Sequence, residues 1–152
     1  MNMTKNKMLI FEANIDDMNP QWFDYVMEKL FAAGAVDVTL EPIQMKKNRP
    51  ATRLVAMAPP SLRETIITII FQETTTLGVR YYSVERRVLQ RTLKTVRTRL
   101  GRIIVKVATD GKAIKKVVPE YESCKKLALK RKIPLAEVYR EIEAHARRHM
   151  RR

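Results

Sequence analysis

The sequence predicts an α+β fold: a ferredoxin-like βαββαβ sandwich followed by a basic β-hairpin and two short C-terminal helices. Two observations lead to this prediction. Within residues 8–88, four strand-like apolar runs alternate with two helix-like segments in the order that a split βαβ unit requires. Beyond residue 89, both the charge balance and the spacing of apolar residues change. We therefore divide the chain into a disordered tail (1–7), a ferredoxin-like domain (8–88) and a basic hairpin with a helical appendage (89–152).

The elements of the first domain follow from apolar spacing and from helix-end residues. Asn19 and Pro20 predict a helix start, because Asn caps helices and Pro suits the first helical position. Apolar residues then recur every three or four positions up to Phe31, and Gly34 is typical of a helix C-terminus. A second helix is expected after Pro60. The strands are expected at 8–15, 35–40, 53–58 and 79–88.

The second half of the chain has a different pattern. Residues 95–100 and 102–108 predict a hairpin around Gly101, with charged residues at alternate positions. Residues 119–132 and 134–148 each begin with Pro and space their apolar residues as helices do. The sequence contains no internal repeat.

Composition narrows the class of protein. The chain has 152 residues, no apolar run of membrane-spanning length, and a polar start that lacks the apolar centre of a signal peptide. The one cysteine, Cys124, excludes an internal disulfide and fits a reducing compartment. We therefore expect a cytoplasmic protein with no membrane partner. Cys124 lies on the apolar side of its helix, which favours a buried structural thiol over a nucleophile.

The net charge of +14 is unevenly distributed. Residues 1–85 carry 9 Lys and Arg against 10 Asp and Glu, whereas residues 86–152 carry 21 against 6. Such a positive half raises the local concentration of anions, whether these are nucleotides, nucleic acid or acidic partners. A merely solvated basic surface is the simpler interpretation.

Three polar segments are expected to meet at one edge of the predicted sheet. In a βαββαβ sandwich the first and second strands run in the same direction. The end of the first strand, the hairpin after the second and the start of the fourth therefore share an edge. Those places hold residues 14–17 (Asn-Ile-Asp-Asp), 44–49 (Gln-Met-Lys-Lys-Asn-Arg) and 73–80 (Glu-Thr-Thr-Thr-Leu-Gly-Val-Arg).

These residue types suit a metal-bound polyphosphate. Asp16 and Asp17 offer hard oxygen ligands for Mg²⁺ or Mn²⁺, which takes one or two carboxylates together with phosphate oxygens. Lys46, Lys47 and Arg49 can neutralise phosphate charge. The Thr74–Thr76 run adds hydroxyl donors, and Gly78 permits a close backbone approach. Each signal also has an ordinary interpretation: an acidic helix start, a solvated turn and a satisfied helix end.

Four segments resemble a known family, the nickel insertion proteins, in their C-terminal part. They are Asn-Ile-Asp-Asp-Met (14–18), Pro-Ile-Gln-Met-Lys-Lys-Asn-Arg-Pro (42–50), Glu-Thr-Thr-Thr-Leu-Gly-Val-Arg (73–80) and Pro-Glu-Tyr-Glu-Ser-Cys (119–124). Such proteins complete the nickel-pincer nucleotide cofactor of lactate racemase. The resemblance implies a CTP-dependent cyclometallase, a lyase-type enzyme that inserts Ni²⁺ into a pyridinium bis-thiocarboxylate mononucleotide. It also implies that CTP binds to this C-terminal part with Mn²⁺ or Mg²⁺.

The resemblance implies roles for the residues at the predicted edge, and leaves the catalytic residues unassigned. Asp16 and Asp17 become ligands of the CTP-bound metal. The residues expected to contact CTP are Lys46, Lys47, Arg49, Thr74, Thr75 and Arg80. Family proteins also have a longer N-terminal region, rich in metal ligands, that this chain lacks. We therefore expect this chain alone to bind CTP and metal, with that region as a partner and with self-association into a homo-oligomer.

Two other classes of function are compatible with the composition, namely an RNA-binding module and an effector-binding oligomerisation domain. An RNA-recognition module stacks bases on aromatic residues of its central strands. Residues 53–58 contain no aromatic residue, and the first strand offers only Phe11. We therefore do not expect a nucleic acid partner. His145 and His149 have metal-ligand spacing, but the surrounding arginines disfavour a cation there.

Overall fold

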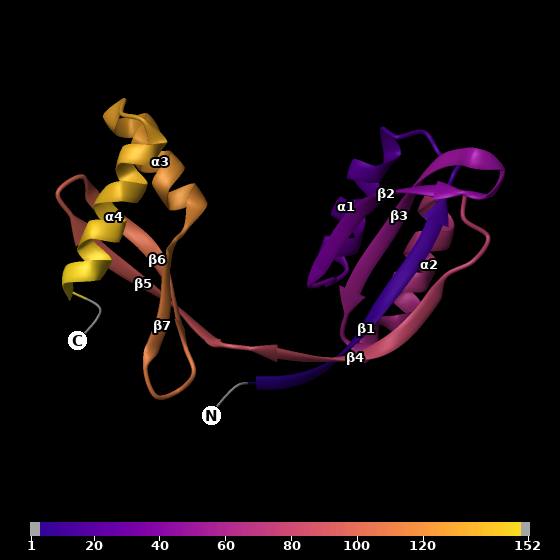
Figure 1. The fold of residues 1–152 in the computed structure, drawn as a ribbon, viewed down its shortest axis with the longest axis horizontal. Coiled ribbons are helices and arrows are strands. Elements are labelled where there is room, and N and C mark those ends of the chain that lie inside the picture. Colours follow the sequence, from indigo (N-terminus) through magenta and orange to yellow (C-terminus); the bar gives the residue numbers. More distant parts are fainter. Residues whose placement is uncertain (1–3, 150–152) are drawn as a thin grey trace. The chain divides into compact units, whose positions relative to one another are not determined.

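The computed structural model describes residues 4–149, and describes side chains for residues 7–114 and 116–145. The chain forms two compact units, one of residues 5–86 and one mainly of residues 87–149 (Figure 1). Each unit has its own hydrophobic core. Within the described residues, none of the helices combines the length and the apolar character needed to cross a membrane.

The first unit is the predicted ferredoxin-like sandwich. Its sheet has the strand order β2-β3-β1-β4, and both β1 and β2 are antiparallel to β3. Two helices cover one face of this sheet (Figure 1). The elements are β1 (Thr4–Ile15), α1 (Trp22–Ala32), β2 (Asp37–Met45), β3 (Arg49–Ala58), α2 (Arg63–Glu73) and β4 (Arg80–Val88).

Three strands of the first unit, β1, β2 and β3, are longer than the sequence predicts. Strand β1 begins at Thr4, so residues 4–7 belong to a strand and not to a tail, whereas Met1–Met3 lie outside the described residues. Strands β2 and β3 pair without interruption from Asp37↔Met57 to Met45↔Arg49. Backbone pairing needs no apolar side chain. The polar residues at these strand ends therefore join the strands although the apolar spacing of the sequence does not predict it.

The core of the first unit is built from alternate residues of the sheet and one side of each helix. Its largest fully buried side chains are Phe11, Leu30, Leu54, Ile66 and Ile70. Full burial of an aliphatic or Phe side chain stabilises a fold by about 1.5–3 kcal/mol. The helical spacing of the buried positions in α1 and α2 is therefore the main reason that these segments pack on the sheet.

Gly34 ends helix α1, as the sequence predicted. Its φ of +100° lies in the region that favours glycine, and the amide of Ala35 donates to the carbonyl of Leu30. A Cβ at position 34 would lie 2.9 Å from Leu62 Cδ1. Glycine therefore serves both the backbone turn and the close approach of the α2 region.

The second unit contains a three-stranded antiparallel sheet with the order β5-β6-β7, and two helices that pack on it. The predicted hairpin around Gly101 and both predicted helices are present. The third strand was not predicted, because Ile114–Pro119 is short and its apolar run is interrupted by two lysines. The elements are β5 (Gln90–Thr98), β6 (Gly101–Thr109), β7 (Ile114–Pro119), α3 (Tyr121–Arg131) and α4 (Leu135–His149).

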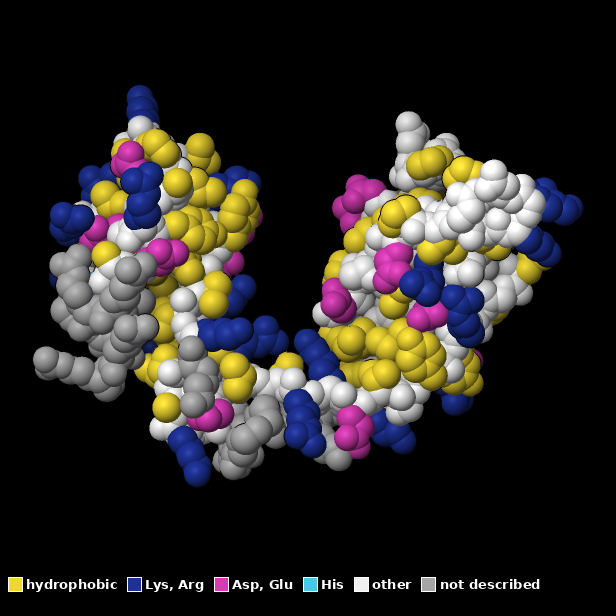
Figure 2. All heavy atoms as spheres, viewed as in Figure 1, with side chains coloured by type: hydrophobic (Ala, Val, Ile, Leu, Met, Phe, Trp, Pro, Cys, Tyr) yellow, Lys and Arg dark blue, Asp and Glu magenta, His cyan; other side chains and the backbone are white. Residues whose placement is uncertain are grey.

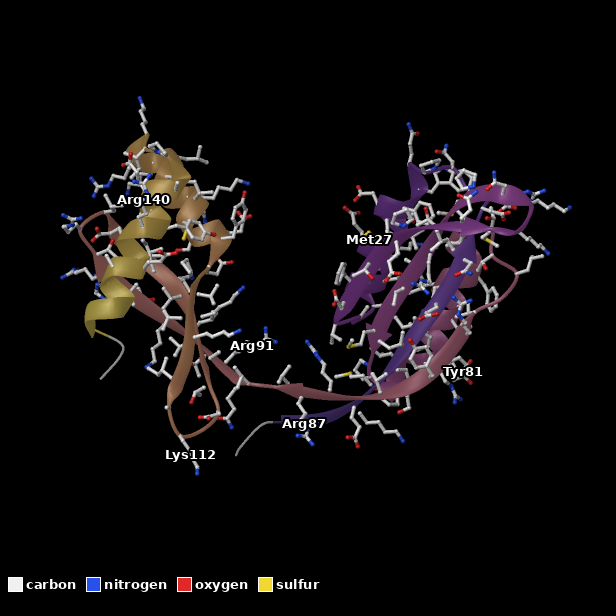
Figure 3. All side chains as sticks on the ribbon, viewed as in Figure 1. Met27, Tyr81, Arg87, Arg91, Lys112 and Arg140 are labelled. Atoms are coloured by element: carbon white, nitrogen blue, oxygen red, sulfur yellow. The ribbon has the colours of Figure 1, made fainter. Side chains whose placement is uncertain are left out.

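The second unit buries Ile103, Val105, Val138 and Ile142 together with Cys124, whose exposed fraction is 0%. Burial raises the pKa of the Cys124 thiol, which disfavours the reactive thiolate. Lys and Arg side chains are spread over the visible face of this unit (Figure 2). Lys112, at the turn between β6 and β7, and Arg140, on α4, point outward (Figure 3).

Candidate functional site

Two hydrogen-bonded contacts join the three polar segments at one edge of the first unit. Arg49, at the start of β3, forms an ion pair of 3.1 Å from its Nη1 to Oδ2 of Asp16. The hydroxyl of Thr75, in the connection from α2 to β4, donates to Oδ1 of Asp17 at 2.5 Å. The adjacent carboxylates after β1 therefore contact both other segments, as the strand order leads one to expect.

The turn between β2 and β3 presents two lysines to solvent. Residues Lys46–Asn48 form a single 3₁₀ turn, in which Lys47 and Asn48 have φ values of 61° and 57°. The side-chain amide of Gln44 donates to Oδ1 of Asn48 at 2.9 Å, which closes this turn. Among the described residues, neither Lys46 nor Lys47 forms an ion pair, so both ammonium groups remain able to bind an anion.

Arg80 connects the first and last strands of the unit. Its Nε donates to Oε2 of Glu12 at 2.7 Å, and its Nη2 donates to Oδ1 of Asn14 at 2.9 Å. The Tyr82 hydroxyl donates to the other Glu12 oxygen at 2.9 Å. The Arg80 guanidinium, followed by the Tyr82 hydrogen bond, lowers the pKa of Glu12 below its usual value. Glu12 is therefore held as a carboxylate at neutral pH.

Sequence reasoning missed Glu12 and Tyr82. A signal was available, because Glu12 and Asn14 lie two residues apart on one strand and therefore face the same side of the sheet. The partner strand supplies Arg80 and Tyr82 with the same spacing. Cross-strand pairs of this kind follow only from the register between two strands, which the sequence does not give directly.

The three threonines at 74–76 have different structural roles. The Thr74 hydroxyl donates to the carbonyl of Ile70 at 2.7 Å and accepts from the amide of Thr76, so it terminates helix α2. The Thr76 hydroxyl donates to the carbonyl of Gly78. Of the three hydroxyls, that of Thr75 reaches the aspartate pair.

The donor set fits a hard divalent cation that also binds phosphate. Within the described residues there is no group of three or more His, Cys, Asp and Glu side chains that could enclose a metal ion. Asp16, whose side chain is 20% exposed, and Asp17 offer adjacent carboxylates instead. Mg²⁺ and similar ions commonly take one or two carboxylates and complete their shell with phosphate oxygens and water. The side chain of His149 lies outside the described residues, so the structure does not test the metal-ligand spacing of His145 and His149.

The family model described as nickel insertion protein matches residues 1–139. The chain belongs to this family. This confirms the resemblance carried by the four sequence segments.

A family relative from Thermotoga sp. strain RQ2 is 46% identical over 134 residues, which are 88% of this chain and 33% of the relative. Its name is pyridinium-3,5-bisthiocarboxylic acid mononucleotide nickel insertion protein. A relative from Geobacter sp. strain M21 is 48% identical over 137 residues, which are 90% of this chain and 34% of that protein. The chain thus spans about a third of the length of the curated relatives it matches.

A solved structure of this family has the same fold. It is LarC2 in its apo form, the C-terminal domain of a cyclometallase involved in the synthesis of the NPN cofactor of lactate racemase. It is 42% identical, with a TM-score of 0.89, and the match covers 93% of this chain and 97% of LarC2. Protein MK0293 from Methanopyrus kandleri AV19 shares the fold at 23% identity, with a TM-score of 0.70 over 96% of this chain and 90% of that protein.

Proposed function

We propose that the first unit binds CTP with Mn²⁺ or Mg²⁺, as part of an enzyme that inserts Ni²⁺ into a pyridinium bis-thiocarboxylate mononucleotide. The name of the Thermotoga relative and the cyclometallase origin of LarC2 support this reaction. The chain spans about a third of its relatives, so the insertion step is assigned to the whole protein. The portion of the relatives beyond this chain is the proposed partner that holds the nickel. The CTP–metal complex is assigned to residues 5–86.

The observation that carries the proposal is the aspartate pair, which contacts both other segments. Asp16 accepts from Arg49, and Asp17 accepts from Thr75. A metal–triphosphate complex carries a cation that can bind the aspartates and phosphate oxygens that can accept from Arg49. Arg49 can exchange the carboxylate for a phosphate oxygen, while Asp16 exchanges the guanidinium for the metal ion. The Arg49 side chain is 54% exposed, and such surface ion pairs contribute about 0–1 kcal/mol, so this exchange costs little.

Each residue of the candidate site has a proposed role in binding the metal–triphosphate complex. Asp16 and Asp17 would hold the metal, which when bound neutralises the charge of the phosphate chain. Lys46 and Lys47 act as point charges, and Arg49 as a two-pronged donor. Thr75 orients Asp17, and Thr74 supports the same turn by ending helix α2. Arg80 fixes β4 against β1 through Glu12 and Asn14, and its remaining N–H groups are the proposed contact to CTP.

Metal dependence is the direct test of this site. We expect Asp16→Asn combined with Asp17→Asn to abolish the Mn²⁺-dependent part of CTP affinity, a loss of about tenfold to a hundredfold. Asn keeps the size of Asp and leaves an oxygen to accept from Thr75, so the fold should persist. Isothermal titration of the purified chain with CTP, with and without Mn²⁺, gives both affinities.

A matched control removes the same number of carboxylates elsewhere in the unit. Asp24→Asn with Asp37→Asn changes two exposed positions, on α1 and at the start of β2, and should leave CTP binding intact. Unchanged Mn²⁺-dependent binding in a folded Asp16/Asp17 variant would sink the assignment.

A further inference from the structure

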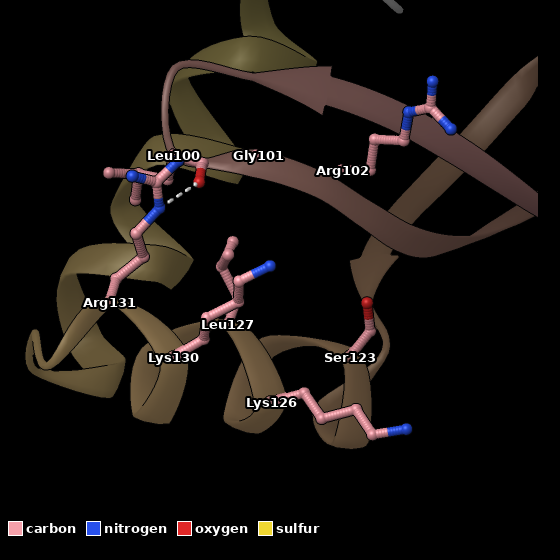
Figure 4. Close-up of a pocket in the computed structure, with 8 residues that line it drawn as sticks. All are labelled: Leu100, Gly101, Arg102, Ser123, Lys126, Leu127, Lys130 and Arg131. Carbon is pink, nitrogen blue, oxygen red and sulfur yellow. Dashed lines mark hydrogen bonds between the residues drawn. The ribbon is translucent and has the colours of Figure 1, made fainter.

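The second unit contains a cavity that the proposed CTP site does not use. Its volume is about 610 Å³, within the size range of small-molecule sites (Figure 4). It lies between helix α3 and the turn from β5 to β6. The residues that line it are Leu100, Gly101, Arg102, Ser123, Lys126, Leu127, Lys130 and Arg131.

Specific contacts fix the walls of this cavity. A Cβ on Gly101, whose φ is +143°, would lie 3.2 Å from Leu127 Cδ1, so helix and turn approach closely there. Arg131 Nε donates to the carbonyl of Leu100 at 3.0 Å. The amide of Ile104 donates to the Ser123 hydroxyl oxygen at 2.9 Å. The cavity is therefore set by tertiary contacts and does not depend on a mobile loop.

The lining combines an apolar surface with excess positive charge. Leu100 and Leu127 supply the apolar part, and the described lining includes four cations but no Asp or Glu. Within the described residues, Arg102, Lys126 and Lys130 form no ion pair. Figure 4 shows Lys130 extending toward the β5–β6 turn, while Lys126 extends away along the outer side of the helix.

Helix electrostatics explain only part of this charge. Lys130 and Arg131 lie in the last turn of α3, where basic side chains stabilise a helix end. Arg102 belongs to strand β6 and gains nothing from that effect. Figure 4 shows the guanidinium of Arg102 extending away from helix α3, so it adds positive charge near the cavity without pointing into it.

The cavity also gives a use to the family segment at 119–124, which the CTP site leaves unexplained. Glu120 caps α3 by accepting from the amide of Ser123 at 2.8 Å, and Cys124 is buried. Ser123 lies at the cavity wall. Its oxygen accepts from Ile104, so its hydroxyl proton remains able to donate to a bound oxygen.

We propose that this cavity binds an aromatic mononucleotide, with the phosphate monoester on Lys130 and Ser123 and the flat ring against Leu100 and Leu127. The cavity would then be the second substrate site of the chain. This identification depends on the proposed function in one respect, since the pyridinium mononucleotide in the name of the Thermotoga relative belongs to this ligand class.

The test uses the intact chain and nicotinic acid mononucleotide, a stable pyridinium mononucleotide, as the probe. Binding is followed by the NMR methyl signals of Leu100 and Leu127, which a ring against them should shift. We expect Lys130→Glu to weaken binding about tenfold or more, because it removes a charge-assisted contact to phosphate. The riboside without phosphate should bind at least tenfold more weakly than the mononucleotide.

Lys125→Glu is the matched control. Lys125 lies on the same helix, outside this cavity and over the Tyr121 ring, so its reversal changes the net charge as Lys130→Glu does. Its effect should stay below about twofold. Equal losses for the two reversals, or a single-stranded RNA that competes equally well, would make the region a general polyanion surface and overturn the proposal.

Measuring CTP with Mn²⁺ on the same variants separates the two sites. The pocket proposal expects the Asp16/Asp17 variant to keep mononucleotide binding, and Lys130→Glu to keep CTP binding. If CTP binding fails in the unaltered chain while the mononucleotide result holds, the proposed function is wrong and the pocket assignment stands. If Lys130→Glu removes CTP binding and the Asp16/Asp17 variant does not, the cavity is a CTP site and its assignment as a second substrate site is overturned.

Discussion

The two units of this chain differ in charge balance and in how far their cations are paired. In the first unit the candidate site contains nearly balanced charges, and its guanidinium groups at Arg49 and Arg80 are paired with carboxylates. In the second unit positive charge is in large excess, and among the described residues Arg102, Lys126 and Lys130 near the α3 cavity form no ion pair. A balanced site releases one partner when it binds another, whereas an excess of charge attracts anions from a distance. Net charge alone would therefore favour the second unit, whereas the proposed CTP site lies in the first.

The largest expected effect concerns the separate cores. Leu30→Ala should destabilise the first unit by about 2–5 kcal/mol, and Ile142→Ala the second by a similar amount, because both side chains are essentially fully buried. Hydrogen exchange should then accelerate in residues 5–86 for the first variant and in residues 87–149 for the second. The exposed positions Leu77 and Leu129 provide controls, for which substitution by Ala should change stability by less than about 0.5 kcal/mol. Faster exchange throughout the chain in either core variant would contradict the two-core description.

An intermediate effect tests which unit neutralises phosphate. Replacing Lys46, Lys47 and Arg49 by Ala should weaken CTP at least tenfold and CMP clearly less, since a triphosphate loses more contacts. The charge-matched control replaces Lys106, Lys112 and Lys116 of the second unit, which should leave CTP affinity within about twofold. Titration of each variant with both nucleotides measures the difference. Equal losses for CTP and CMP would place the three residues away from the outer phosphates.

The smallest effect is a pH dependence at Glu12. Its pKa in the folded protein lies below the ordinary value of 4.5, because Arg80 and Tyr82 donate to the carboxylate. The resulting stabilisation is present above pH 4.5 and disappears as the pH falls through the lowered value. Glu12→Gln should therefore cost up to about 1 kcal/mol at neutral pH and nothing at sufficiently low pH. Urea denaturation of both proteins between neutral and acidic pH gives this difference, and a gap that widens on acidification would contradict the stated sign.

The fold of the first unit could be predicted from the sequence because apolar spacing and helix-end residues are local features that agree with one another. The spacing of Phe23, Val26 and Leu30 predicted α1, and Gly34 marked its end. Strand β7 was missed because its pairing with β6 comes from tertiary contacts that no local pattern in Ile114–Pro119 reveals. Tertiary context commonly decides the structure of such short, mixed segments.

Of the candidate site, the sequence could predict which segments meet but not which atoms. Strand direction was enough to bring Asp16, Asp17 and Arg49 to one edge. The pairing of Arg80 with Glu12 depends on the register of β4 against β1, and the hydrogen bond of Thr74 to Ile70 depends on where α2 ends. The α3 cavity was not predicted at all, because it arises from the approach of Leu127 to the turn at Gly101.

The contacts that join different segments of the candidate site are distant along the chain. Arg49 is 33 residues from Asp16, Thr75 is 58 from Asp17, and Arg80 is 68 from Glu12. Contacts of such high order require the closure of long loops, whose entropy cost must be met before the contacts can form. On the ribosome, the site cannot exist until β4 has emerged and joined β1. A ligand that requires these contacts recognises only the completed unit, so its binding energy adds directly to the resistance of that unit to unfolding and proteolysis.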